Sequence, residues 1–135
     1  MDSKNENRET QDHGDIENWE AAKAATAAFV QERDWEQFHA LKELIIGLNV
    51  EAGELLEHTL WAERGAFEDE AIHEGEKRKA ILDECADILF FLIRILDRMD
   101  ADPWNILEQK MKQNARKYPV ERARGRSDKY TAYQD

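Results

Sequence analysis

The chain has 135 residues, the size of one domain, and its 41% hydrophobic and 36% charged residues are typical of a soluble globular protein. A formal net charge of −11, from 30 acidic and 19 basic side chains, argues against nucleic acid as a general partner, because the phosphate backbone repels an acidic protein. The single cysteine, Cys85, excludes an intramolecular disulfide, and neither a secretory signal nor an apolar run of about 18 residues is present, so we expect a cytoplasmic protein without a membrane partner.

The chain begins with a polar tail and continues as helix. Residues 1–15 contain no apolar side chain after Met1 and are predicted to be disordered. Residues 16–135 are predicted to form one helical domain. Its first helix is expected over residues 16–34, which are rich in alanine and contain neither glycine nor proline.

The second and third helices carry the clearest apolar periodicity. The second, residues 36–64, is predicted to be the longest, with a core stripe of Leu41, Leu44, Ile45, Leu48, Ala52 and Leu55. A charged connection follows over residues 65–78, with space for one helical turn. The third helix, residues 79–99, is expected to bury Ile81, Leu82, Cys85, Ile88, Leu89, Leu92 and Leu96.

The fourth helix has start and stop signals. Asp102 is predicted as its N-cap and Pro103 as its first helical residue, and Pro119 ends it. The polar segment beyond, residues 120–135, has Tyr130 and Tyr133 as anchors. Because strand-like alternation is missing throughout, the predicted fold class is all-α, a four-helix bundle.

Two carboxylate pairs lie inside these apolar helices. Glu51 and Glu54 are three residues apart on the second helix, and Glu84 and Asp87 repeat this spacing on the third. Residues three apart project from one side of a helix, so four carboxylates converge if the two helices pack together. Such charges repel one another unless a hard divalent cation such as Mg²⁺, which prefers oxygen ligands, lies between them.

Two other interpretations compete with this one. The acidic pairs are also consistent with two solvated faces. A di-iron bundle would need two Glu-x-x-His motifs, and the sequence has one, Glu70 to His73, in the charged connection. His39 and His58 are interpreted as polar or supporting groups rather than as metal ligands.

Five stretches together resemble a known family. They are "RDWEQFH" (33–39), "EAGELLEHTLW" (51–61), "DECADILFFL" (83–92), "KMKQNARKYP" (110–119) and "SDKYTAY" (127–133). In this order and spacing they resemble the MazG-like all-α nucleoside triphosphate pyrophosphohydrolases, and within them the dCTP pyrophosphatase branch. The resemblance covers the chain from about residue 16 to its end.

The resemblance implies Mg²⁺-dependent hydrolysis of a nucleoside triphosphate to a monophosphate and pyrophosphate, by a homo-oligomer, a tetramer or else a dimer. The implied metal-binding and catalytic residues are Glu51, Glu54, Glu84 and Asp87. The implied substrate-binding residues are Trp35, Gln37, His39, Trp61, Phe91, Lys110 and Asn114. Trp61 is seven residues after Glu54, and is therefore expected two turns along the same helix face.

The sequence departs from the dCTP branch at two positions. Phe91 stands where that branch has tyrosine, and Thr26 where it has histidine. These changes remove hydrogen-bonding groups from the base pocket, so the predicted substrate is dCTP or a modified dCTP, with a broader specificity that includes dUTP as the alternative. From another class of protein, an acidic helical binding module or a DNA mimic remains an alternative.

Oligomerisation is also expected from apolar residues outside the predicted core stripes. Ile46 and Val50 on the second helix and Phe90 and Ile93 on the third are predicted to lie on the surface of one chain. A symmetric assembly would cover them.

Overall fold

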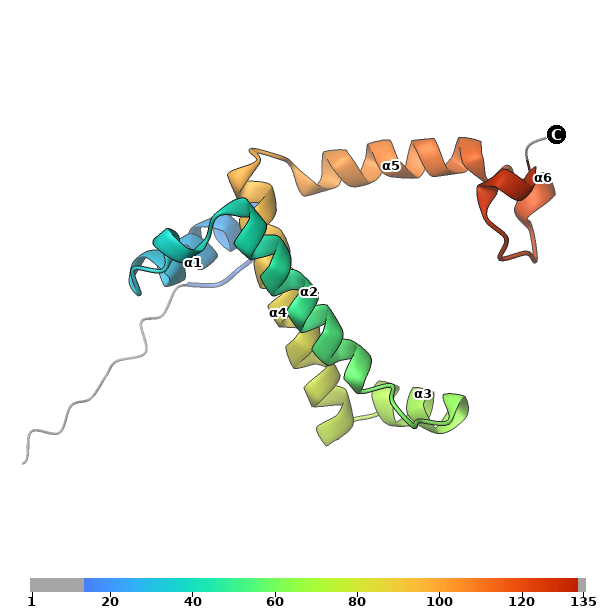
Figure 1. The fold of residues 1–135 in the computed structure, drawn as a ribbon, viewed down its shortest axis with the longest axis horizontal. Coiled ribbons are helices and arrows are strands. Elements are labelled where there is room, and N and C mark those ends of the chain that lie inside the picture. Colours follow the sequence, from blue (N-terminus) through green and yellow to red (C-terminus); the bar gives the residue numbers. More distant parts are fainter. Residues whose placement is uncertain (1–13, 134–135) are drawn as a thin grey trace, which may run out of the picture. The chain divides into compact units, whose positions relative to one another are not determined.

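The computed structural model describes residues 14–133, and each regular element in that range is a helix, as the all-α prediction requires (Figure 1). Most of the tail predicted to be disordered lies outside the described residues. The chain divides into two compact units, one up to Ile95 and one from Leu96, and each is described by itself. Within residues 14–133, no helix has both the length and the hydropathy that crossing a membrane requires.

The first unit contains most of the helices. Their bounds are α1 Trp19–Gln31, the 3₁₀ helix η1 Glu36–Phe38, α2 Leu41–Glu57, α3 Arg64–Ile72 and α4 Glu76–Arg98, whose last turn continues into the second unit. The second unit contains α5 Pro103–Lys117, the short α6 Val120–Ala123 and the 3₁₀ helix η2 Tyr130–Tyr133.

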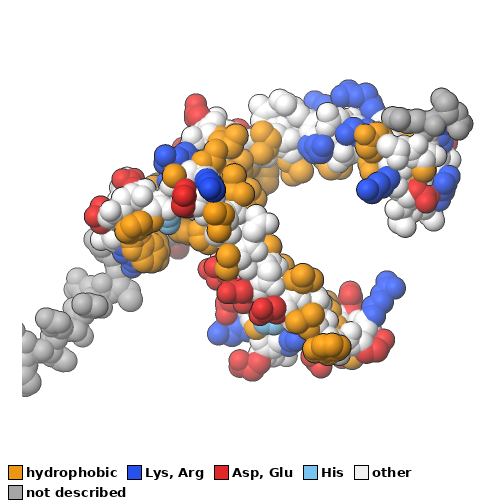
Figure 2. Space-filling view, viewed as in Figure 1, with side chains coloured by type: hydrophobic (Ala, Val, Ile, Leu, Met, Phe, Trp, Pro, Cys, Tyr) orange, Lys and Arg blue, Asp and Glu red, His pale blue; other side chains and the backbone are white. Residues whose placement is uncertain are grey.

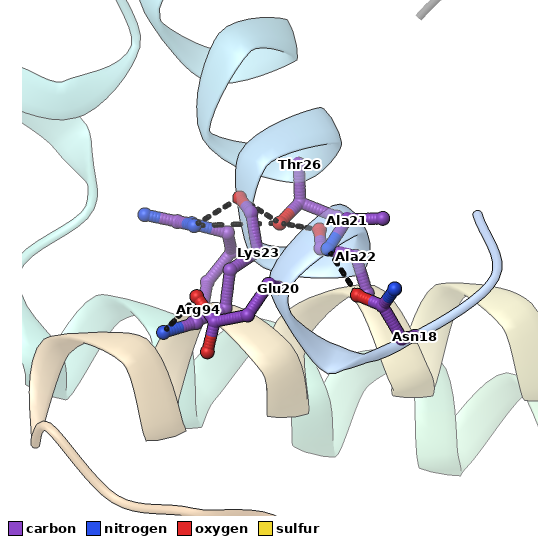
Figure 3. Close-up of polar contacts among 7 residues, drawn as sticks. All are labelled: Asn18, Glu20, Ala21, Ala22, Lys23, Thr26 and Arg94. Carbon is purple, nitrogen blue, oxygen red and sulfur yellow. Dashed lines mark hydrogen bonds and ion pairs between the residues drawn. The ribbon is translucent and has the colours of Figure 1, made fainter. Parts of the chain in front are cut away.

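Side-chain caps fix the starts of α1 and α5. The Asn18 side chain accepts a hydrogen bond from the Ala21 amide at 2.9 Å (Figure 3). The Asp102 side chain accepts from the Asn105 amide at 2.8 Å, with proline in the first turn. Each cap satisfies an amide that has no partner inside the helix. The predicted start of the fourth helix is thus confirmed, and so is its end before Pro119.

The prediction of one helix over residues 36–64 is wrong at its start. Residues Glu36–Phe38 form a separate 3₁₀ turn. Ala40 has extended dihedral angles, φ −64° and ψ 159°, so α2 begins only at Leu41. The longest helix is α4, with 23 residues, and not α2, with 17.

The same prediction is wrong at its end, because α2 stops at Glu57. The Thr59 hydroxyl donates to the carbonyl of Leu56 at 2.7 Å, a bond that offers the backbone an alternative to continued helix. Trp61 follows with φ at 60°, in the left-handed region. Trp61 therefore does not lie two turns along the α2 face, contrary to expectation.

The charged connection contains more structure than one helical turn. Helix α3 has nine residues, and the Glu63 side chain caps it by accepting from the Gly65 and Ala66 amides at 3.0 and 3.1 Å. These amide donors stabilise the ionised carboxylate and lower the pKa of Glu63. Gly75, with φ at 155°, separates α3 from α4, which begins at Glu76 and not at residue 79.

Helices α2 and α4 lie side by side and run antiparallel (Figure 1). Phe91 of α4 lies against Gly47 of α2, and further along α2 the His58 Nε2 lies 3.5 Å from Glu84 Oε1. Moving forward along one helix therefore means moving backward along the other. A β-carbon at residue 47 would lie 2.4 Å from the Phe91 ring, so this close approach requires glycine.

A glycine pair on α2 tests this packing. We expect Gly47→Ala to lower the thermal midpoint, because its methyl group would overlap the Phe91 ring, although alanine is the better helix former by about 1 kcal/mol. Gly53→Ala is the matched control, since a β-carbon there meets nothing within 4 Å, and it should raise the midpoint. Equal midpoint changes in the two variants, measured by circular dichroism, would contradict the close approach.

The buried residues of the first unit come from three helices: Val30 of α1, Leu44 of α2 and Ile93 of α4. Ile93 was expected on the surface and is only 8% exposed. The α1–α4 contact also includes polar groups, because Arg94 donates to the Thr26 hydroxyl at 3.3 Å and to the Lys23 carbonyl at 3.4 Å (Figure 3).

Much of the predicted core is exposed in the single chain. The exposed residues among the predicted stripes are Leu41, Ile45, Leu82, Cys85, Leu89 and Leu92. Hydrophobic side chains are accordingly visible on the surface of the first unit (Figure 2). Periodicity identified apolar faces correctly, but α4 has apolar residues on more than one face, and α1 and α2 cover only part of them.

The second unit is anchored by tyrosines, as predicted. Tyr133 is 6% exposed, its ring centroid lies 5.9 Å from that of Tyr118, and its carbonyl accepts a hydrogen bond from Arg122. The Tyr130 ring also contacts Tyr118, with centroids 6.3 Å apart. These contacts hold the C-terminal segment against the end of α5.

Candidate functional site

Three carboxylates converge between α2 and α4. One carboxylate oxygen of each of Glu51, Glu54 and Glu84 lies within 4.8 Å of the others. The register explains why: going forward from Gly47, Glu51 and Glu54 are four and seven residues along α2, and going backward from Phe91, Asp87 and Glu84 are four and seven residues along α4. The two acidic pairs are thus brought to the same level of an antiparallel helix pair.

Asp87 does not belong to this close group of three. Its side chain is exposed, but its negative charge still raises the pKa of Glu51, so the two carboxylates interact. The structure therefore brings together Glu51, Glu54 and Glu84 directly and Asp87 electrostatically. Acidic side chains are also visible over this part of the first unit (Figure 2).

Burial and the crowding of like charges together perturb the pKa of Glu51 strongly. Its pKa is raised from 4.5 to about 7, first by desolvation, then by a hydrogen bond with Glu54 and by the charges of Glu54, Asp87 and Glu84. The raised pKa shows that negative charge on these neighbouring carboxylates is unfavourable without a partner. A bound cation would offset that charge. Mg²⁺ prefers oxygen ligands, and these side chains offer only carboxylate oxygens, so they fit that ion.

This electrostatic strain predicts a pH dependence of stability in metal-free protein. In the folded chain Glu51 binds its proton more tightly than in the unfolded chain. Between pH 4.5 and about 7 the folded state therefore holds more protons, and this group makes the free energy of unfolding fall as pH rises, until the effect levels off above about 7. Glu51→Gln should remove this contribution.

The measurement is thermal unfolding in chelator at pH 5, 6 and 8. Relative to wild type, Glu51→Gln should become progressively more stable as pH rises. A difference between the two proteins that does not change with pH would contradict the raised pKa of Glu51.

Five rings form a closed cluster beside the carboxylates. Centroids are 5.8 Å apart for Phe29 and Trp35, 6.4 Å for Trp35 and His39, and 6.5 Å for His39 and Phe91. Phe90 completes the cluster at 5.5 Å from Phe91 and 5.9 Å from Phe29. The sequence indicated Trp35, His39 and Phe91. Phe29 and Phe90 were missed as part of the site, although Phe90 directly precedes Phe91.

His39 is the polar member of this cluster. Its Nδ1 atom is buried and has no hydrogen-bond partner among the described residues. Burial, and then the positive charge of Arg94, lower the pKa of His39, so the neutral ring is favoured. A neutral imidazole with one unsatisfied nitrogen can accept or donate a single hydrogen bond.

Trp35 and Gln37 lie in the segment between α1 and α2. Trp35 is 42% exposed, and one of its ring neighbours is His39. The Gln37 amide donates to the backbone carbonyl and to the carboxylate of Asp34, both at 2.9 Å, which stabilises the turn in which Asp34 has φ at 54°. In this structure Gln37 therefore serves the loop that presents Trp35.

Trp61 lies in the turn after α2, fully exposed, with its backbone in the left-handed region. This conformation costs a bulky residue roughly 1–2 kcal/mol. A fully exposed indole makes no packing contact that would offset this cost in the isolated chain. Residues with such strained backbones cluster at functional positions.

Lys110 and Asn114 lie on α5, in the second unit. Lys110 donates to Gln113 at 3.0 Å, and Asn114 is partly buried near the end of the helix. The same unit has a cavity of about 350 Å³ lined by Gln113, Arg116, Lys117, Pro119, Tyr130 and Tyr133. Their part in substrate binding stays a prediction.

Comparison with known proteins supplies the class. Residues 46–132 match the model of the MazG-like family, so the chain belongs to that family, as its sequence motifs predicted. It is also similar to a solved structure, the crystal structure of a pyrophosphatase from Archaeoglobus fulgidus DSM 4304. The TM-score is 0.68 at 30% sequence identity, over 79% of this chain and 97% of that one.

Curated relatives point to the particular branch. The chain is 36% identical to dCTP pyrophosphatase 1 of Rattus norvegicus and 38% identical to that of Homo sapiens, in each case over 105 residues and 78% of this chain. These matches confirm the resemblance to the dCTP pyrophosphatase branch. The chain spans 61% of the length of each of these two relatives.

Proposed function

We propose that this protein is a Mg²⁺-dependent nucleoside triphosphate pyrophosphohydrolase that converts dCTP or a modified dCTP and water to the monophosphate and pyrophosphate, as a nucleotide-pool housecleaning enzyme. The observation that carries this proposal is the convergence of Glu51, Glu54 and Glu84 from two helices, with the pKa of Glu51 raised to about 7. Its relatives include proteins named dCTP pyrophosphatase 1, which supports the choice of substrate.

In this proposal Glu51, Glu54, Glu84 and Asp87 hold Mg²⁺ and form the catalytic site. When bound, such an ion would polarise the phosphate oxygens and make a water easier to deprotonate. One of these carboxylates, where the ion does not saturate it, would accept the proton of that water.

The remaining predicted residues receive roles in binding. Trp35, Trp61 and Phe91 are proposed to stack on the base, and His39 to bond its polar edge, since the buried Nδ1 has no partner among the described residues. Gln37 supports this loop through Asp34. Lys110 and Asn114 are proposed to contact the phosphates and sugar.

The test is a panel of nucleoside triphosphates with Mg²⁺, read out as pyrophosphate release. Fastest turnover of dCTP or a modified dCTP supports the proposal. Comparable turnover of dUTP and other triphosphates would favour the broader pyrophosphohydrolase. That outcome would agree with Phe91 and Thr26, which lack the hydrogen-bonding groups found at these positions in the dCTP branch. If no triphosphate is hydrolysed, the result favours the alternative hypothesis of an acidic helical binding module over that of an enzyme.

We further propose that residues 16–135 act as one domain of the four-helix bundle type in a cytoplasmic homotetramer. In one chain Ile46 and Val50 of α2 are 52% and 53% exposed, and Leu82 and Leu89 of α4 are 49% and 55% exposed. Apolar faces of this kind mark interfaces. Ile93, which is buried within the chain, no longer counts among these residues.

Light scattering at micromolar concentration should therefore give the mass of a tetramer, or of a dimer as the smaller symmetric alternative. Leu89→Glu should lower that mass by placing a charge in the covered face, whereas Glu57→Lys, on an exposed polar position of α2, should leave it unchanged. A monomer for the wild-type chain would contradict the proposed assembly.

A further inference from the structure

We propose that His58 is a positioning residue for the carboxylate site: its imidazole nitrogen Nε2 holds the Glu84 carboxylate in the orientation in which that group binds a divalent cation. The inference rests on the proposed function, because it needs the carboxylates to be a metal site. The sequence indicated only that His58 is a polar or supporting group, and its contact with Glu84 gives it a specific partner.

The position of His58 follows from helix geometry. Along α2, His58 comes four residues after Glu54 and seven after Glu51, so all three side chains project from the same face. His58 is also the C-cap of α2, and its own amide bonds back to the carbonyls of Leu55 and Leu56. The ring is therefore attached to a fixed backbone at the end of the face that carries the carboxylates.

The contact that His58 makes crosses between helices. Its Nε2 lies 3.5 Å from Oε1 of Glu84 on α4, with side chains that are only 23% and 20% exposed. Within residues 14–133, a second histidine–carboxylate pair joins His73, the C-cap of α3, to Asp69 of the same helix, with side chains 69% and 77% exposed. Only the first pair is sheltered enough for one interaction to fix a side chain.

A fixed Glu84 matters for a cation. Glu84 has three rotatable bonds before its carboxylate, and Mg²⁺ requires near-ideal ligand positions. A partner that holds the second oxygen of a ligating carboxylate reduces the rotamer freedom lost on binding, and removal of such partners typically weakens metal affinity by about 10–100-fold. Of the three converging carboxylates, Glu84 is the one that lies 3.5 Å from a histidine nitrogen.

The choice of ring nitrogen allows a selective set of variants. The amide nitrogen of glutamine can reach the position of Nε2, so His58→Gln should retain the contact with Glu84. Asparagine reaches only the level of Nδ1, and leucine has no donor, so His58→Asn and His58→Leu should both lose it. His73→Leu is the matched control, since it breaks a histidine–carboxylate pair away from the three carboxylates.

The experiment is calorimetric titration of each protein with MgCl₂ at pH 8 in the absence of nucleotide, with circular dichroism to confirm that helix content is unchanged. We expect His58→Leu and His58→Asn to raise the Kd for Mg²⁺ about tenfold or more, and His58→Gln and His73→Leu to change it by less than about threefold.

Two results would overturn the inference: wild-type affinity in folded His58→Leu and His58→Asn, or an equal loss in His58→Gln, which would show that the donor at Nε2 is not what matters. If His58→Leu does not fold, His58→Asn gives the same comparison. If the wild-type protein itself binds no Mg²⁺, the metal site of the proposed function is wrong, and so is the role of His58. A loss of affinity that is confined to the variants is a different result and leaves the metal site in place.

Discussion

Glu51→Gln should lower the rate of pyrophosphate release from dCTP by at least about 100-fold, because it removes a carboxylate that holds the ion or accepts the proton of the attacking water, and loss of proton transfer alone costs about 100-fold or more. Glutamine keeps the size of the side chain but can neither take a proton nor offer a negative oxygen to a cation. The helical signal should persist, because the substitution removes a carboxylate whose charged form is disfavoured by burial and by its acidic neighbours. The measurement is kcat and KM under saturating Mg²⁺.

Related substitutions separate the site from charge in general. Glu54→Gln, Glu84→Gln and Asp87→Asn should also abolish turnover, whereas Glu57→Gln, an exposed change at the end of the same helix α2, should leave it close to wild type. Near wild-type rates in any two of the first group would refute the assignment of four carboxylates. Loss of activity in Glu57→Gln would indicate that overall charge, and not the cluster, is responsible.

Trp61→Ala should reduce kcat/KM for dCTP about tenfold or more, since stacking of a base on an aromatic ring contributes roughly 1–3 kcal/mol. In the single chain Trp61 is fully exposed on a left-handed backbone, so its removal deletes no core contact and should not lower stability. Affinity for Mg²⁺ should be unchanged. Steady-state kinetics, together with calorimetric Mg²⁺ titration, test both statements.

The neighbouring residue gives the control for this prediction. Leu60 is 58% exposed in the same turn, so Leu60→Ala removes apolar surface at almost the same place without removing an aromatic ring. We expect its kcat/KM to stay within about threefold of wild type, because an aliphatic side chain offers no stacking face. Equal losses in the two variants would mean that Trp61 acts through the conformation of the turn or through an interface, and not by stacking.

The electrostatics of the first unit connect these predictions. The closeness of Glu51 to Glu54 and Glu84 is unfavourable in the chain alone. A cation that neutralises the three carboxylates would relieve this repulsion, and the relief would favour binding of the ion. Binding to the folded state alone should also stabilise it, by about 2.7 kcal/mol at a Mg²⁺ concentration 100 times Kd. Stability and activity are thus expected to respond to the same ion.

The sequence by itself determined which residues can share a face. The spacing from Glu51 to Glu54 and from Glu84 to Asp87 follows from the helix repeat alone, and the order of motifs was sufficient to predict the MazG-like family, which the comparisons confirm. Local chemistry also determined the start of α5 at Pro103, because the Asp102 side chain accepts from the Asn105 amide and Pro103 has no amide hydrogen that needs a partner.

Only the tertiary structure decided the register between the helices. The contact of Phe91 with Gly47 sets α4 against α2, and this register brings Glu84 to Glu51 and Glu54. Helical periodicity cannot supply such a register, because it repeats every turn and therefore allows several alignments of two apolar faces. The contact between His58 and Glu84 depends on the same alignment.

Burial and helix ends were decided in the same way. Because α4 has apolar residues on several faces, its sequence could not tell that Ile93 is buried while Leu89 remains exposed; the positions of α1 and α2 determine that. The end of α2 before Trp61 depends on a balance between the Thr59 side-chain bond and one more helical turn. Such balances are small in free energy, so the surrounding structure, and not local propensity, settles them.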